Sequence, residues 1–206
     1  MSLYQEHVLP RIINVLCGVK LSQPLRAEAC SGLSGRVLEI GFGSGLNVPH
    51  YPTDVTRVDA IEPSDVAWHL ARDRVEESPV EIERTGRDAQ QLPFADATFD
   101  SALSTWTMCT IPDAALALAE VRRVLKPGGT LHFLEHGKAP DEGVRRWQER
   151  LEPLQIRMAG GCHLTRQIPD LVESAGLQIE SLDAFYQEQA PKPLAALTVG
   201  VATTPT

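Results

Sequence analysis

Strand-like and helical segments alternate along the centre of this chain, and this alternation restricts the fold more than any other feature of the sequence. The expected strands cover residues 36–41, 55–62, 80–84, 98–104 and 130–136, and the expected helices cover 65–78 and 113–125. Strands joined by helices of this length form a parallel sheet with helices on both faces. Sheets of this kind bind ligands at the carboxyl ends of their strands.

The segments on either side of this core follow other patterns. Residues 1–34 carry apolar side chains near helical spacing and predict a helical cap, within which Pro10 starts or breaks a turn. After residue 137 we expect helices over 140–159 and 166–176, and then two strands, over 177–186 and 193–203, that pair as an antiparallel edge.

The length and the lack of a linker predict a single domain. The chain has 206 residues, and no Ser- or Gly-rich stretch separates its parts. We therefore divide one domain, 1–206, into a cap (1–34), a central core (35–137) and a C-terminal part (138–206).

Charge and cysteine usage exclude several classes of partner. A formal net charge of -8 argues against a nucleic-acid or anionic-membrane surface, because binding phosphates draws mainly on Lys and Arg. The four cysteines lack C-x-x-C spacing, so we expect reduced thiols, a cytoplasmic protein and no metal site. No apolar run approaches the ~18 to 20 residues of a spanning helix, and we expect no membrane insertion. The oligomeric state stays open.

Three glycines follow the first expected strand as G-x-G-x-G, at Gly41, Gly43 and Gly45. Glycine accepts a positive φ and lets a ligand approach the backbone, although such a pattern also suits a plain strand-to-helix turn. The pyrophosphate-binding fingerprint is G-x-G-x-x-G, and here the third glycine comes one residue early. The spacing therefore disfavours NAD or FAD.

Two acidic residues further along suit an adenosine-containing ligand. Glu62 ends the second expected strand, just before Pro63, about 20 residues after the glycine turn, where a carboxylate can accept both ribose hydroxyls. Asp59 lies on the opposite face of that strand. Asp88 precedes a turn and either accepts from an adenine amine or serves as an N-cap or Asx-turn carboxylate.

Taken with LPFADATFD (92–100) and EVRRVLKPGG (120–129), these motifs resemble the class I S-adenosylmethionine-dependent methyltransferases. The resemblance covers about residues 36–136. It implies an α/β, Rossmann-like fold with a seven-stranded sheet of order 3-2-1-4-5-7-6, the last strand antiparallel, and S-adenosylmethionine as cofactor, with S-adenosylhomocysteine as product. The core would then bind the cofactor, and 138–206 would form the acceptor side.

The same resemblance implies roles for individual residues. Glu39 and the glycine turn would hold the methionine part of the cofactor, Glu62 would hold its ribose, and Asn47 and Pro63 would also belong to the cofactor site. The adenine would contact Asp88 and Ala89, the methyl end would contact Ser104 and Thr105, and Tyr4 of the cap would close over the cofactor.

A closer resemblance concerns the methyl acceptor. LEIGFGSGLNVPHYP (38–52), LEHGKAP (134–140), RRWQERLEPL (145–154) and GGCHLTRQ (160–167) resemble the mammalian alkyl thiol S-methyltransferases and their soluble bacterial relatives. This implies a small-molecule acceptor, a thiol or sulfide. A lipid or quinone-like N- or C-methyl acceptor is the alternative, and an NAD-dependent oxidoreductase or a non-catalytic binding module would be a different class.

Candidate catalytic residues follow the last strand of the core. A thiol attacks as the thiolate, so a histidine near the acceptor would help it. His136 with Glu135, at the carboxyl end of that strand, is the first candidate, and His163 beside Cys162 is the second. The alternatives are a histidine bonded to loop backbone and small buried cysteines.

Overall fold

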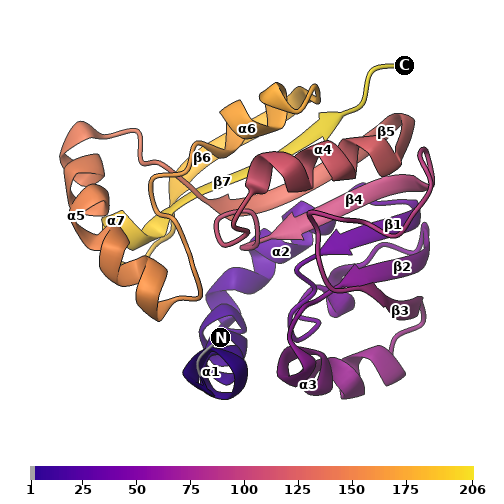
Figure 1. Ribbon diagram of the computed structural model, residues 1–206, viewed down its shortest axis with the longest axis horizontal. Coiled ribbons are helices and arrows are strands. Elements are labelled where there is room, and N and C mark those ends of the chain that lie inside the picture. The colour runs from indigo at the N-terminus through magenta and orange to yellow at the C-terminus, as the bar shows by residue number, and fades with distance from the viewer. Residues whose placement is uncertain (1–2) are drawn as a thin grey trace.

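The computed structural model describes residues 3–206 and contains one seven-stranded sheet (Figure 1). The strand order is β3-β2-β1-β4-β5-β7-β6, as the family resemblance implies, and β7 runs antiparallel to both β5 and β6. The predicted fold class and sheet order are therefore confirmed. The strands are β1 (Gly35–Ile40), β2 (Val55–Ile61), β3 (Glu81–Gly86), β4 (Phe99–Thr105), β5 (Leu125–His136), β6 (Gln178–Tyr186) and β7 (Ala196–Thr203).

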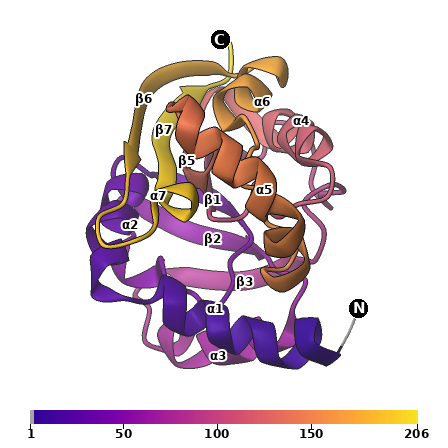
Figure 2. The ribbon, with the colours of Figure 1, turned by 90° about the vertical axis from the view of Figure 1, so that its left-hand side faces the viewer.

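Helices cover both faces of this sheet. They are the π-helical turn η1 (Tyr4–Val8), α1 (Leu9–Cys17), η2 (Lys20–Ser22), α2 (Gln23–Cys30), η3 (Val48–His50), α3 (Asp65–Glu76), α4 (Ala114–Val124), α5 (Glu142–Met158), α6 (Ile168–Ser174) and α7 (Lys192–Ala195). In both ribbon views α4 and α6 lie side by side on one face, and α1 runs alongside α3 (Figure 2). None of the helices within residues 3–206 is both long and apolar enough to cross a membrane.

Strand alternation divides the core into two layers. Leu38 of β1 packs with α4 and α6 on one face, whereas its neighbour Val37 packs with α2 on the other. Phe133 and Leu134 of β5 divide in the same way. Successive side chains of a strand point to opposite faces, and in a sheet covered on both sides both sets are apolar.

Two segments differ from the prediction, and proline and glycine explain both. Residues 192–195 form α7 where a strand was expected from residue 193, because proline near the start of a helix has the required φ and cannot donate to a sheet ladder. Strand β5 begins at Leu125 and includes KPGG, where Gly128 has a φ of 73° and the register against β4 shifts.

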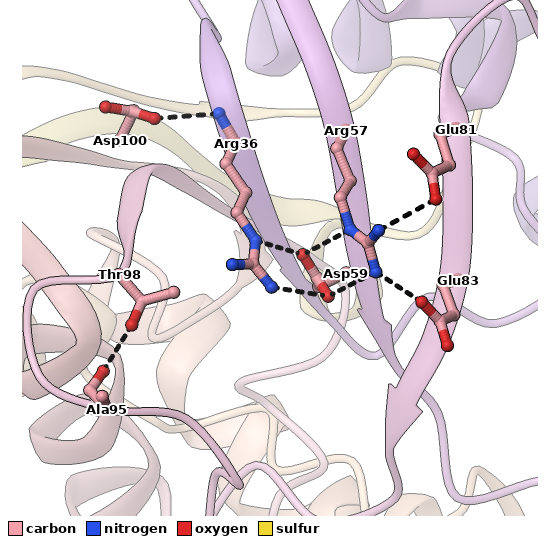
Figure 3. Close-up of polar contacts among 8 residues, drawn as sticks. All are labelled: Arg36, Arg57, Asp59, Glu81, Glu83, Ala95, Thr98 and Asp100. Carbon is pink, nitrogen blue, oxygen red and sulfur yellow. Dashed lines mark hydrogen bonds and ion pairs between the residues drawn. The ribbon is translucent and has the colours of Figure 1, made fainter.

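The buried carboxylate of Asp59 joins β1 and β2 (Figure 3). Arg36 Nε donates to it at 2.7 Å and Arg57 Nε at 3.3 Å, while Arg57 also reaches Glu81 and Glu83 of β3. Asp59 therefore holds the strands in register, and this structural role accounts for an acidic residue facing away from the ligand side.

We expect Asp59→Asn to lower the free energy of unfolding by about 1–3 kcal/mol, because the two arginines lose a charged acceptor but stay partly hydrated. Urea unfolding measures this loss. Asp65→Asn is the matched control, since Asp65 also binds two arginines but is 71% exposed, and its loss of stability should be clearly smaller than that of Asp59→Asn. Equal losses in the two variants would contradict the role given to Asp59.

Candidate active site

The three glycines of the turn after β1 serve different purposes. Their φ angles are 69°, 59° and 73° at Gly41, Gly43 and Gly45. A Cβ on Gly41 would lie 2.7 Å from Cβ of Thr107, and one on Gly45 would press on neighbouring side chains at 3.3 Å. A Cβ on Gly43 would meet only the Gly41 carbonyl oxygen, at 3.8 Å. Gly41 and Gly45 thus allow close packing, whereas Gly43 borders open space.

The carboxylate of Glu62 lies against this turn at the end of β2. It accepts from the backbone N–H of Gly43 at 2.6 Å and from that of Ser64 at 2.7 Å, and the residue is 5% exposed. Burial raises the pKa of Glu62, and the two N–H donors oppose that rise. An acceptor is therefore held beside the open side of the turn.

A buried polar network supports the turn from behind. Asn47 Nδ2 donates to Glu39 Oε1 and to Thr105 Oγ1, both at 2.9 Å, and Arg26 Nη1 donates to Asn47 Oδ1 at 2.7 Å. Tyr51 donates its hydroxyl to the other oxygen of Glu39. Burial raises the pKa of Glu39 to about 7 against these hydrogen bonds. Glu39 and Asn47 are nearly fully buried, so in this structure they position the turn.

A cavity of about 460 Å³ opens beside the turn. Its lining comes from the turn, the end of β4 with the loop that follows, α1, α5 and the segment around α7. Its apolar lining includes Ile13, Leu16, Phe42, Leu46, Trp106 and Leu194. The cavity therefore extends from the glycine turn to the C-terminal part of the chain.

Trp106 occupies a strained position in the wall of this cavity. Its φ is 49°, which is unusual for a bulky residue, and such strain is concentrated at functional sites. The guanidinium of Arg26 lies 4.6 Å from its ring centroid, and the His136 ring lies edge-on at 6.4 Å. The indole thus contacts both the buried polar network and the His136 ring.

Three potentially reactive side chains meet in the same cavity. They are Cys109, after β4, His136, at the end of β5, and Cys162, after α5. Hydrogen bonding to Cys109, aided by His136 and Gln155, lowers the pKa of the Cys162 thiol against the effect of burial. The structure therefore brings His136, the first candidate for catalysis, next to the two cysteines.

Other predicted residues lie outside the cavity lining. Glu135 is fully buried and accepts from Ser104 Oγ at 2.7 Å and from Thr107 N at 3.0 Å. Burial raises its pKa. His163 pairs with Glu152 at 3.1 Å on the α5 side. In this structure Glu135 organises the loop after β4, and His163 secures the loop after α5.

The remaining candidates lie at the edges of the site. Asp88 is exposed and accepts from Gln90 N at 2.9 Å, the Asx-turn arrangement that its sequence context also allows, with Ala89 buried beside it. Pro63 is exposed next to Glu62. The Tyr4 hydroxyl donates to the Met158 carbonyl at 3.0 Å, and Tyr4 is not among the residues that line the cavity. The α1 residues that do line it are Ile13, Leu16 and Cys17.

Arg26 belongs to the buried network of the site, although no sequence motif marks it. It is 4% exposed, and its guanidinium reaches Asn47, Thr105 and the backbone of Cys17. Burial lowers its pKa and nearby acidic groups oppose this. In the sequence it stands out only as the single cation of a short helix, and an exposed arginine would fit that pattern equally well.

A ligand of the adenosyl type fits these features. The Gly43 side of the turn is open, the Glu62 carboxylate stands beside it, and the cavity continues past Thr105 towards the C-terminal part. Carboxylates at the end of a second strand hold ribose hydroxyls in related sheets.

Comparisons with known proteins agree with this arrangement. A family model described as "Methyltransferase domain" matches residues 38–133. A solved structure from Thermotoga maritima, described as a SAM-dependent methyltransferase and possible histamine N-methyltransferase, superposes with a TM-score of 0.70 at 23% identity, covering 98% of each chain. This structural likeness supports the fold.

Two curated relatives differ in how much of the chain they match. Thiol S-methyltransferase TMT1B of Homo sapiens is 34% identical over 181 residues, which cover 84% of this chain and 71% of that protein. Phosphatidylethanolamine N-methyltransferase of Cereibacter sphaeroides is also 34% identical, but over 123 residues, which cover 57% of this chain and 60% of that protein.

Proposed function

Because this chain belongs to the class I S-adenosylmethionine-dependent methyltransferases, we propose that it methylates the sulfur of a small-molecule thiol. The observation that carries the proposal is the cavity that joins the glycine turn to Cys109, His136 and Cys162. S-adenosylmethionine supplies a methyl group on a positively charged sulfur, and the protein must present an acceptor in line with it.

The extent of similarity favours a thiol over a lipid. The match to the human thiol S-methyltransferase covers 84% of this chain, compared with 57% for the bacterial lipid N-methyltransferase, at the same 34% identity. Residues that bind the cofactor are expected in both classes of methyltransferase, so the additional matched residues bear on the acceptor. We therefore assign the binding of the acceptor to the C-terminal part, 138–206, within a single domain.

The chain's own residues would divide the work along the cavity. Glu62 would accept the ribose hydroxyls, and the turn at Gly43 would let the ligand lie against the backbone. Trp106 and the apolar residues of α1 would exclude water and take the carbon part of the acceptor. His136, in the cavity wall beside Trp106, would contact the acceptor sulfur, which makes it the candidate catalytic residue.

A panel of acceptors tests the proposal. With labelled S-adenosylmethionine, we expect methyl transfer to small alkyl thiols, and little to amines, phenols or dispersed lipids. We expect His136→Ala to lower kcat on the best thiol about tenfold or more while the Kd for S-adenosylhomocysteine changes less than twofold, since contact with the acceptor accounts for a substantial part of the barrier reduction.

Other outcomes would identify the competing functions. Transfer to a lipid or an amine with thiols inert would reject the thiol and favour the lipid alternative. Stabilisation by NADH and not by S-adenosylhomocysteine in a thermal-shift assay would contradict the interpretation that the glycine turn disfavours NAD. A His136→Ala variant with unchanged kcat would remove His136 from the mechanism.

A further inference from the structure

Two thiols and an imidazole come together in the wall of the cavity. One ligand atom from each of Cys109, His136 and Cys162 lies within 4.8 Å of the others. The three residues come from three separate segments, after β4, at the end of β5 and after α5, and all three line the cavity. Such a convergence of soft donors is the usual composition of a zinc site.

The loops that carry the two cysteines are tied to each other. The backbone N–H of His163 donates to the Cys109 carbonyl at 2.8 Å. Arg166 Nη1 donates to the carbonyls of Met108 and Ile111 on either side of it. Because these bonds cross between the loops, the backbone positions of Cys109 and Cys162 are fixed relative to each other.

A second set of bonds fixes the loop after β4 to the strand that carries His136. The buried carboxylate of Glu135 accepts from Thr107 N at 3.0 Å and from Cys109 N at 3.3 Å. Glu135 is the residue next to His136, so the loop and the imidazole share one support. Hydrogen-bonded supports of this kind orient ligands around metal ions.

We propose that Cys109, His136 and Cys162 bind a soft divalent metal ion such as Zn²⁺, with an open fourth position that takes the acceptor thiol. Tetrahedral zinc with two sulfur ligands and one nitrogen ligand places the donor atoms about 3.5–3.8 Å apart, which small side-chain rotations from the present spacing would reach. Catalytic zinc sites keep three protein ligands and one open position, and here all three ligand residues line the cavity.

The assignment of the fourth position rests on the proposed thiol methyltransferase function, whereas the metal site itself does not. Metal binding releases the protons of both cysteine thiols, and the acceptor thiol loses its proton to solvent as its sulfur binds. That sulfur then forms a bond to the methyl carbon as the bond from carbon to the cofactor sulfur breaks, giving a thioether and S-adenosylhomocysteine.

Metal binding is tested on reduced protein from which metal has been removed with a chelator. We expect one Zn²⁺ per chain by equilibrium dialysis with elemental analysis, and d–d absorption of tetrahedral Co²⁺ when cobalt replaces zinc. Cys109→Ser and Cys162→Ser should each weaken Zn²⁺ binding at least about tenfold, since even loss of a supporting residue has this effect. Cys17→Ser, a thiol of the same cavity outside the cluster, is the matched control and should retain the ion.

The outcomes separate the site from its use. Failure of the wild type to bind Zn²⁺ and Co²⁺ with its four thiols titrated as free, or equal binding by Cys162→Ser, would overturn the site. Zn²⁺ binding with no thiol methylated would leave the site standing and reject the proposed function. If thiols are methylated and removal of the metal leaves kcat unchanged, the assignment of the fourth position to the acceptor thiol fails. If removal of the metal lowers kcat, Zn²⁺ restores it and the affinity for S-adenosylhomocysteine stays unchanged, the assignment is supported.

Discussion

Replacing Gly41 by alanine is expected to lower the free energy of unfolding by about 3 kcal/mol, or to prevent folding. A φ of 69° costs an L-residue about 1–2 kcal/mol, and overpacking of a filled site costs a further 1–3 kcal/mol. The new Cβ would lie 2.7 Å from Cβ of Thr107 and still closer to its Oγ1. The turn would have to move away from the loop after β4, and with it the backbone that borders the cavity. Urea unfolding measures the loss.

Gly43→Ala is the matched control, because the two glycines have similar φ angles but different surroundings. Its Cβ would enter open space, so we expect a stability loss of only about 1–2 kcal/mol from the backbone angle. The same Cβ would occupy the ligand side of the turn, and we expect S-adenosylhomocysteine to bind about tenfold more weakly or worse. If Gly41→Ala were as stable as Gly43→Ala, the assignment of packing to the first glycine and binding to the second would be wrong.

The place of a residue in the fold could be predicted from the sequence where that residue directly follows an expected strand. The end of the second strand is marked by Glu62 and Pro63, and the structure shows the Glu62 carboxylate at the carboxyl end of that strand, beside the glycine turn. The order of the seven strands came from the family resemblance, and the antiparallel edge pair also came from periodicity. These features are local or are shared by a whole fold class.

Residues that act through long-range packing could not be located in this way. Arg26 reaches Asn47 and Thr105 from a helix before the first strand, and no periodicity predicts which way its side chain points. Cys109 and Cys162 lack the close spacing of sequence-recognisable metal sites, so the sequence predicts no metal, and only folding brings them to His136. Asp88 had two interpretations from the sequence, and in the structure its carboxylate closes its own turn.

Replacing Glu62 by alanine is expected to weaken S-adenosylhomocysteine binding by about 100-fold. Hydrogen bonds to a charged acceptor contribute about 1.5–3 kcal/mol each, and the proposed contact with the ribose includes two hydroxyls. The carboxylate is already held by Gly43 N and Ser64 N, so it needs no reorganisation to accept a ligand. Isothermal titration with the cofactor product gives the affinity, and thermal unfolding of the same samples gives the stability.

A loss of stability must be separated from a loss of binding, because the substitution leaves two backbone N–H groups without their acceptor. Ser64→Ala provides that control: the Ser64 hydroxyl caps α3 by accepting from Ala67 N at 3.1 Å, and its loss should cost about 1 kcal/mol with the carboxylate intact. We expect Ser64→Ala to be destabilised yet to bind within about twofold of the wild type. If both variants bound equally well, Glu62 would have a purely structural role, and the ribose would have to be held by another group beside the glycine turn.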